Sequence, residues 1–157
     1  SALIYAPTSS GKTFISYYAM EQSLRQNNSD MVVFIAPNKA LANQIVAEIY
    51  TRFGSKKYPN HCTTQLFSML MPDYTINDPT NCQILVTVPY SFKNALSRRS
   101  LWLKKIKYII IDEIQTLDDI SELETLDLEK ILHVIQCPML ALSATIGNLD
   151  KFYDWLN

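Results

Sequence analysis

The sequence predicts an α/β fold in which helices cover a mostly parallel central sheet. Three observations support this prediction. Short apolar, strand-like runs alternate along the chain with stretches of helical character. Most of these runs are apolar at every position, which is typical of strands buried on both faces of a parallel sheet. Small or polar residues follow several of the runs, where ligands bind in such sheets.

The first part of the chain shows this alternation clearly. Residues 3–5 are apolar and predict a strand, and a helix is expected over residues 12–26. Residues 31–36 are almost continuously apolar, which indicates a buried strand, and the next helix is expected over residues 39–53.

Residues 54–82 are expected to be the least regular part of the chain, with a weaker strand at residues 63–67. The turn-forming residues of this part are Gly54, Pro59, Pro72 and Pro79. Residues 84–88 predict a further strand. Pro89 suits the first turn of a helix over residues 89–97, because its missing N–H costs nothing there.

The last elements follow the same pattern. Residues 108–111 are entirely apolar and predict a buried strand, and a helix is expected over residues 123–135. Its apolar positions repeat near the helical period: Leu126, Ile131, Val134 and Ile135. A strand at residues 139–143 and a closing helix at residues 149–156 complete the prediction.

Composition places the chain among globular proteins. Its 157 residues suit one domain with a substantial core, and 48% are hydrophobic while 18% are charged. No apolar stretch reaches about 18 residues, so no membrane span and no membrane partner are expected. The cysteines Cys62, Cys82 and Cys137 are scattered, which favours inert thiols in a reducing compartment over a disulfide frame or a metal site.

Charge is balanced overall but unevenly distributed. The net charge of −1 argues against a domain that binds polyanions through bulk charge. Basic residues cluster at Lys93, Arg98, Arg99, Lys104, Lys105 and Lys107. This cluster is either a solvated face or part of a groove that follows a nucleic-acid backbone. Nearby aromatic residues either pack or stack on bases: Tyr90, Phe92 and Trp102.

A phosphate-binding loop is predicted directly after the first strand. The loop comprises Ala6, Pro7, Thr8, Ser9, Ser10, Gly11, Lys12 and Thr13. Gly11 lets the backbone approach phosphates, Lys12 can reach the β- and γ-phosphates, and the Thr13 hydroxyl suits Mg²⁺. The general motif has glycine where Ala6 stands, so a Ser-rich turn that caps a helix is the alternative interpretation. The strand–loop–helix setting favours a nucleoside triphosphate site.

Two carboxylates follow the strand at residues 108–111. Asp112 is predicted to hold nucleotide-bound Mg²⁺, partly through water, and Glu113 to orient and deprotonate the attacking water. A helix cap followed by an acidic surface is the alternative. The hydroxyls of Ser143 and Thr145 follow another strand, where they serve either packing or communication with the γ-phosphate.

These motifs, in this order, resemble those of the first RecA-like domain of superfamily-2 DExD/H-box helicases. Residues 6–13 (APTSSGKT) resemble motif I, residues 36–44 motif Ia and residues 86–89 motif Ib. Residues 112–115 (DEIQ) resemble motif II, and residues 143–145 are similar to motif III. The resemblance implies a RecA-like P-loop NTPase fold, a three-layer sandwich around the sheet. It also implies that ATP and Mg²⁺ are the ligands.

Within the superfamily, the chain resembles the superkiller-type branch and its DExD/H-box helicase-sixty-like proteins. This narrower resemblance is carried by residues 81–89, 104–108 and 137–146. It implies a cytoplasmic protein, with the nucleus as the alternative, that acts on RNA. Gln115 stands where this branch usually has His, and Gln cannot change charge as His can.

The resemblance also implies roles for individual residues. Lys12, Glu113 and Gln115 are expected to be catalytic, and Ser143 and Thr145 to couple hydrolysis to strand binding. The residues expected to border a nucleic-acid backbone are Pro37, Asn38, Lys39, Thr87 and Pro89.

The expected function is the ATP-binding motor lobe of an ATP-dependent RNA helicase or translocase. The alternatives are a nucleotide-controlled RNA-binding switch that does not unwind, and a DNA helicase. Residues 1–157 are expected to be a monomeric fragment of a longer chain, without the second RecA-like domain that would be its partner. Because that domain supplies an arginine finger, the fragment alone is expected to be nearly inactive.

Overall fold

Parallel strands form the centre of the structure, a computed structural model that describes residues 2–5, 11–26, 29–56, 65–112 and 137–143. The strands are β1 (Ala2–Tyr5), β2 (Met31–Ile35), β3 (Gln65–Leu70), β4 (Thr75–Ile76), β5 (Cys82–Thr87), β6 (Ile106–Ile111) and β7 (Met139–Ser143). The helices are α1 (Lys12–Gln26), α2 (Lys39–Phe53), α3 (Pro89–Ser97) and the 3₁₀ turns η1 (Pro79–Asn81) and η2 (Leu101–Lys105). Most predicted elements are thereby confirmed; the helices expected at residues 123–135 and 149–156 lie outside the described residues.

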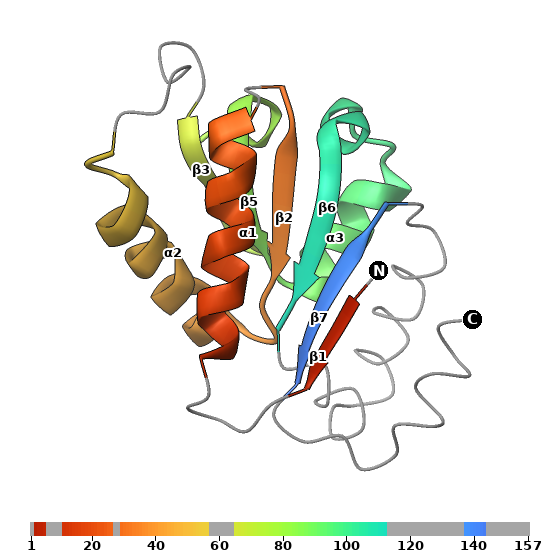
Figure 1. Ribbon diagram of the computed structural model, residues 1–157. Coiled ribbons are helices and arrows are strands. Elements are labelled where there is room, and N and C mark those ends of the chain that lie inside the picture. Colours follow the sequence, from red (N-terminus) through yellow and green to blue (C-terminus); the bar gives the residue numbers. More distant parts are fainter. Residues whose placement is uncertain (1, 6–10, 27–28, 57–64, 113–136, 144–157) are drawn as a thin grey trace.

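The described strands form one sheet in the order β1-β7-β6-β2-β5-β3-β4. Every neighbouring pair is parallel except β3 and β4. Helices α1 and α2 cover one face and α3 covers the other (Figure 1). This arrangement confirms the predicted α/β class with a mostly parallel sheet between helical layers.

Residues 65–82 are more regular than the sequence indicated. The strand expected at residues 63–67 corresponds to β3, which runs from Gln65 to Leu70, while residues 57–64 lie outside the described ranges; β4 and η1 follow β3. The short β4 pairs antiparallel at the sheet edge, where the buried Ser68 hydroxyl donates a hydrogen bond to the Ile76 carbonyl over 3.0 Å. The Asp78 carboxylate caps η1 through the Thr80 N–H at 2.8 Å. Side-chain hydrogen bonds therefore organise a stretch whose prolines suggested irregularity.

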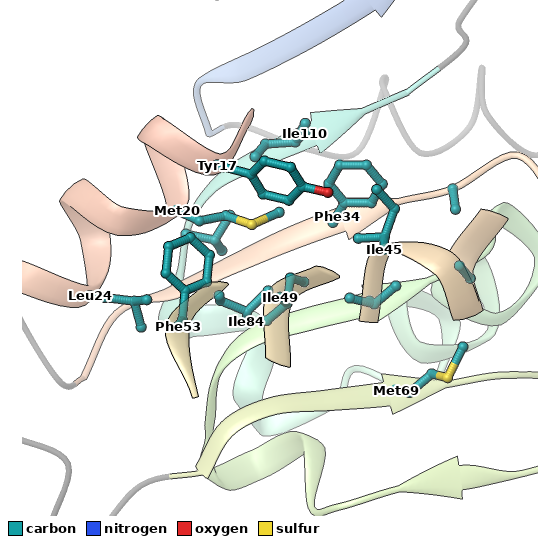
Figure 2. Packing of buried hydrophobic residues seen from close by; sticks show 14 of the residues in the cluster. Tyr17, Met20, Leu24, Phe34, Ile45, Ile49, Phe53, Met69, Ile84 and Ile110 are labelled. Atoms are coloured by element: carbon teal, nitrogen blue, oxygen red, sulfur yellow. The ribbon is translucent and has the colours of Figure 1, made fainter. Parts of the chain in front are cut away.

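Alternate residues of the strands divide the core into two halves. On one face, Val32, Phe34, Ile84, Val86 and Ile110 pack under α1 and α2. Figure 2 shows this cluster, in which α1 contributes Tyr17, Met20 and Leu24 and α2 contributes Ile45, Ile49 and Phe53. The intervening residues Met31, Val33, Ile35, Leu85, Ile109 and Ile111 pack against Phe92, Ala95 and Trp102. The period of two explains why the central strands are apolar throughout.

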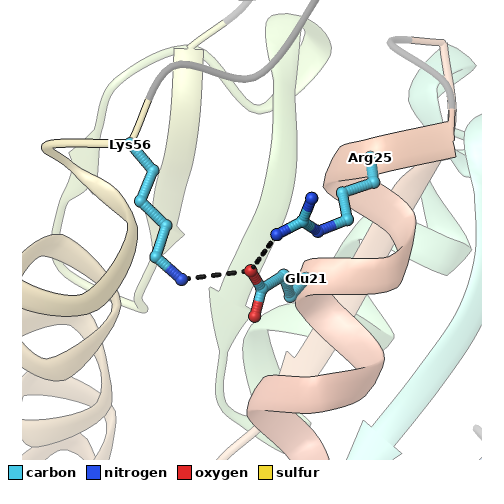
Figure 3. Close-up of polar contacts among 3 residues, drawn as sticks. All are labelled: Glu21, Arg25 and Lys56. Carbon is cyan, nitrogen blue, oxygen red and sulfur yellow. Dashed lines mark hydrogen bonds and ion pairs between the residues drawn. The ribbon is translucent and has the colours of Figure 1, made fainter.

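Polar contacts join the far ends of α1 and α2. One oxygen of Glu21 accepts from Arg25 at 2.9 Å and from Lys56 at 3.0 Å (Figure 3). These two basic groups lower the pKa of Glu21. Because the group is largely solvated, the contact fixes the relative placement of the helices more than it stabilises the fold.

No helix within the described ranges combines the length and the apolar character that crossing a bilayer would require.

Candidate functional site

The carboxyl ends of the parallel strands bring the predicted motifs to one edge of the sheet. β7 lies between β1 and β6, with Tyr5 paired to Ser143 and Ile111 paired to Ala141. β2 and β5 continue the edge, with Ile35 paired to both Ile111 and Thr87. Ligands of such sheets bind beyond this edge. The strands that precede the phosphate loop, the hydroxyl pair and the acid pair are therefore immediate neighbours.

The end of the predicted phosphate loop has the backbone that such a loop needs. Gly11 has φ +82°, a left-handed conformation that favours glycine, and no atom lies within 4 Å of where a Cβ would stand. α1 begins at Lys12, and its first-turn N–H groups with the helix dipole favour an anion. The residues Ala6, Pro7, Thr8, Ser9 and Ser10 lie outside the described ranges.

Thr13 lies in the first turn of α1, where its side chain is partly exposed. Its carbonyl accepts a hydrogen bond from the buried Ser16 hydroxyl at 2.6 Å. The Ser16 hydroxyl is therefore paired within the helix. The Thr13 hydroxyl, in the first turn, is a hard oxygen donor of the kind that Mg²⁺ prefers.

Asp112 lies directly after β6 on the face that α1 covers. Its N–H donates to the Ile35 carbonyl at 3.1 Å, which extends the pairing of β6 with β2 by one residue. Ile110 packs under α1 and Ile111 packs on the α3 side, so strand alternation directs Asp112 toward α1. The charge of Asp112 also contributes to raising the pKa of Tyr17 in α1. Asp112 and the helix that begins at Lys12 thus share one face; Glu113 and Gln115 lie outside the described residues.

Ser143 is the last residue of β7 and is fully buried, in register with Tyr5 of β1. It lies between the strand that leads to the phosphate loop and the strand that leads to Asp112. Ser143 is therefore adjacent to both β1 and β6. Thr145, its predicted partner in coupling, lies outside the described ranges.

A polar contact that the sequence did not indicate connects α1 with α2. The Tyr17 hydroxyl donates to one Glu48 oxygen, and Gln44 donates to the other at 3.0 Å. The Arg52 guanidinium lies 4.4 Å from the centre of the Tyr17 ring. Burial, followed by this hydrogen bond, raises the pKa of Tyr17. In the sequence, Tyr17 has the spacing of a core position in a helix. Its contact with Glu48, 31 residues away, is evident only from the structure.

The amino end of α2 reaches the same sheet edge. The Asn38 side chain accepts from the Leu41 N–H at 2.9 Å and so caps the helix. The Ala36 N–H donates to the Thr87 carbonyl at 2.9 Å, which joins this end to β5. Asn38 and Lys39 are exposed and Pro37 is partly exposed. These three predicted nucleic-acid residues therefore lie together on the surface.

Thr87 and Pro89, also predicted to border nucleic acid, are both buried. The Thr87 hydroxyl donates to the Leu70 carbonyl at 2.8 Å, and Pro89 begins α3. Their side chains thus fix the ends of β3, β5 and α3. Contact between the backbone of this stretch and a nucleic acid stays a prediction. The neighbouring Tyr90 is 54% exposed, whereas Phe92 and Trp102 are buried against each other.

The basic cluster lies away from this edge, except for Lys93, which is one turn into α3. α3 starts at the carboxyl edge and runs back across the sheet, so Arg98 and Arg99 at its end, and η2 before β6, lie at the opposite edge (Figure 1). Lys105 donates to the Thr80 carbonyl at 2.7 Å, and Lys107 lies 3.3 Å from Asp30. Of the two interpretations of the cluster, the fold favours the solvated face.

A turn after β3 adds two residues that the sequence analysis missed. Asp73 lies 3.5 Å from the Lys39 ammonium group, which lies 4.7 Å from the centre of the Tyr74 ring. No sequence pattern indicated them, because residues 71–74 read as an irregular stretch with a proline.

Comparisons with known proteins show the family of the chain. The DEAD/DEAH box helicase family model matches residues 1–152. The chain is 44% identical to an uncharacterized helicase of Caenorhabditis elegans, over 100% of this chain. It is 42% identical, over 99% of its length, to a probable ATP-dependent RNA helicase of Homo sapiens that is named DDX60-like. The chain spans 9% of each of these relatives.

A solved structure shows the same fold. A single-substitution variant of Saccharomyces cerevisiae Dbp5 bound to RNA and ADP BeF3 superimposes with a TM-score of 0.75 and 20% identity, over 97% of this chain and 38% of that protein. At this identity the likeness concerns the fold alone.

Proposed function

The chain belongs to the DEAD/DEAH box helicase family, and from this premise we propose that it is the ATP-binding motor lobe of an ATP-dependent RNA helicase or translocase. One observation carries the proposal. The ends of β1, β7 and β6, the start of α1 at Lys12 and the exposed start of α2 at Lys39 meet at one sheet edge. A nucleotide site and a nucleic-acid surface are thereby built on the same strands.

For the nucleotide, we assign the triphosphate to residues 6–13 and the first turn of α1. The left-handed Gly11 and the start of α1 at Lys12, where the positive end of the helix dipole lies, support this assignment. The donors fit Mg²⁺, because the Thr13 hydroxyl and the Asp112 carboxylate supply hard oxygen atoms from one face of the sheet. When bound, the ion would neutralise charge on the phosphates. Lys12 would add a positive charge at the β- and γ-phosphates.

For hydrolysis, we assign the general base to Glu113, the residue after Asp112. We assign a coupling role to Ser143, Gln115 and Thr145. The position of β7, between the strand of the phosphate loop and the strand of the acid pair, supports this assignment. A change at the γ-phosphate can reach β6 through this strand. The second RecA-like domain of the longer chain would supply the remaining catalytic charge.

For the nucleic acid, we assign the surface of Pro37, Asn38 and Lys39, together with the backbone at Thr87 and Pro89. The cap at Asn38, the exposed Lys39 ammonium group and the amino ends of α2 and α3 support the binding of phosphates. RNA is favoured over DNA because a relative at 42% identity is named an RNA helicase. A cytoplasmic setting fits the free thiols of Cys82 and Cys137.

The test uses the full-length protein, with ATP hydrolysis measured alone, with single-stranded RNA and with DNA of the same sequence. RNA is expected to stimulate hydrolysis more than DNA, and the protein is expected to displace a strand from an RNA duplex. Glu113→Gln is expected to lower kcat by about 10²–10⁴-fold while ATP still binds. Asp112→Asn is expected to raise the Mg²⁺ concentration that half-maximal hydrolysis requires.

Asp30→Asn is the matched control, because Asp30 lies before β2 at the opposite edge of the sheet. Its hydrolysis rate should equal that of the unaltered protein. Stimulation without displacement would favour the RNA-binding switch, and stronger stimulation by DNA would favour the DNA helicase.

A further inference from the structure

Lys39, the lysine of the proposed nucleic-acid surface, forms an ion pair with an acidic residue of the same chain, Asp73. The Lys39 ammonium group lies 3.5 Å from an Asp73 oxygen and 4.7 Å from the centre of the Tyr74 ring. The Lys39 side chain is 52% exposed and that of Asp73 is 77% exposed. The ammonium group thus sits between an aromatic face and a carboxylate, with solvent on its remaining side.

The turn that carries Asp73 is fixed to both neighbouring elements. The Met71 N–H donates to the Tyr74 carbonyl at 2.9 Å, which closes the turn. The Tyr74 hydroxyl lies 3.4 Å from its acceptor on Asn43, one turn into α2. The Thr87 hydroxyl holds the Leu70 carbonyl at 2.8 Å, directly before the turn. These hydrogen bonds hold the backbone of the turn in place, so that the Asp73 side chain can contact Lys39.

We propose that Asp73 is an internal competitor for the nucleic-acid phosphate at Lys39 and so sets the affinity and salt dependence of strand binding. This inference rests on the proposed function. A carboxylate and a phosphate oxygen offer the same acceptor chemistry to an ammonium group. When a strand binds, Lys39 exchanges Asp73 for a phosphate, and the released carboxylate then faces the backbone as a like charge.

Exposure makes this exchange easy. Ion pairs between solvated side chains are weak, so the pair can open without disturbing the fold. Charges at the rim of an interface chiefly change the association rate and the response to salt. The Tyr74 ring keeps the ammonium group near the same place when the carboxylate leaves, because a cation over an aromatic face is held by the ring itself.

The test is a binding titration of the full-length protein with a fluorescent single-stranded oligouridylate at low and high salt. Asp73→Asn is expected to tighten binding about fivefold at low ionic strength, the effect of one unit charge at about 4 Å in water. The gain should fade as salt screens the charges. In a Lys39→Ala background, Asp73→Asn should produce less than half of this gain on the logarithmic scale.

Asp30→Asn is the matched control, because it also removes one negative charge and frees a lysine, Lys107, from an ion pair at 3.3 Å. It lies at the opposite sheet edge and should leave the affinity unchanged. An equal gain in both variants, or a full gain from Asp73→Asn without Lys39, would overturn the inference. Asp73→Asn without any gain, in a protein that binds RNA, would overturn it and leave the proposed function standing. A protein that binds ATP but no RNA would remove both.

Discussion

The Tyr17 hydroxyl of α1 donates a hydrogen bond to the Glu48 carboxylate of α2. It thereby connects the helix that begins at the phosphate loop with the helix that begins beside Lys39. The contact lies on the face of the sheet toward which Asp112 is directed, and the charge of Asp112 contributes to the raised pKa of Tyr17. Movement of α1 relative to α2 therefore strains or breaks this hydrogen bond.

Tyr17→Phe is expected to loosen α1 against α2. The variant removes one donor from the Glu48 carboxylate, which keeps Gln44 as another. The cost is about 1.5 kcal/mol, the lower end for a hydrogen bond to a charged group. Hydrogen exchange of the α1 and α2 amides should accelerate about tenfold. Tyr18→Phe is the control, because Tyr18 is 61% exposed on the same helix. Equal exchange in both variants would show that the Glu48 contact does not hold the helices.

Stability is expected to fall at alkaline pH. Burial raises the pKa of Tyr108, whose hydroxyl donates to the Ala19 carbonyl, above its ordinary value of 10.0. A raised pKa means that the folded state holds this proton more tightly, so its contribution is complete below about pH 10 and is lost as pH rises further.

Urea unfolding at a series of pH values from neutral to alkaline measures this loss, and Tyr108→Phe should reduce the alkaline slope. Tyr90→Phe, at a residue that is 54% exposed, is the control and should keep it. The hypothesis fails if the Tyr108 variant and the unaltered protein lose stability in parallel.

Gly11→Ala is expected to weaken ATP binding about tenfold, because φ +82° costs an L-residue about 1–2 kcal/mol. Calorimetric titration of ATP with Mg²⁺ would measure the loss. Gly11→Asn separates conformation from size, since Asn adopts left-handed angles more readily than Ala. If the backbone angle decides, the larger Asn is tolerated better; if Ala binds ATP more tightly than Asn, close approach of the phosphates decides instead.

Thr87→Val is expected to tighten RNA binding by up to about fivefold at low ionic strength and to leave ATP binding unchanged, because Asp73 then competes less firmly for Lys39. Valine keeps the shape of the side chain but cannot donate to the Leu70 carbonyl, a hydrogen bond worth about 1 kcal/mol. The turn at residues 71–74 would then lose its anchor beside Lys39. Thr87→Ser retains the hydroxyl and should bind RNA normally. Equal RNA affinity in the valine and serine variants would count against this role.

Elements with a strong period could be predicted from the sequence. The bounds of α1, α2, α3 and β7 agree with the expected ranges, because apolar spacing, Pro89 and the small residues at strand ends mark them locally. The strand pairs could not be predicted in the same way. Nothing near Leu3 specifies that its neighbour in the sheet is Ala141.

The place of a residue in the fold could be predicted where a sequence motif marks it, but not where its side chain contacts a residue that is distant in the sequence. Gly11 and Asp112 follow strands and could be assigned from their neighbours in sequence. Asp73 and Glu48 act on residues 34 and 31 positions away, respectively, so no local pattern reveals them. The basic cluster shows the converse, since the sequence left its role open and the fold places Arg98, Arg99 and η2 at the edge opposite the candidate site.

The position of β7 between β1 and β6 has a consequence for biosynthesis. The register of β1 with Met139–Ser143 means that the segment leading to the phosphate loop obtains this neighbour only after more than 130 further residues have been translated. Contacts so distant along the chain form slowly, because loop closure must precede them. While the nascent chain emerges from the ribosome, β2, β5 and β6 can already pair with one another. The nucleotide pocket should therefore be the last part of the domain to mature.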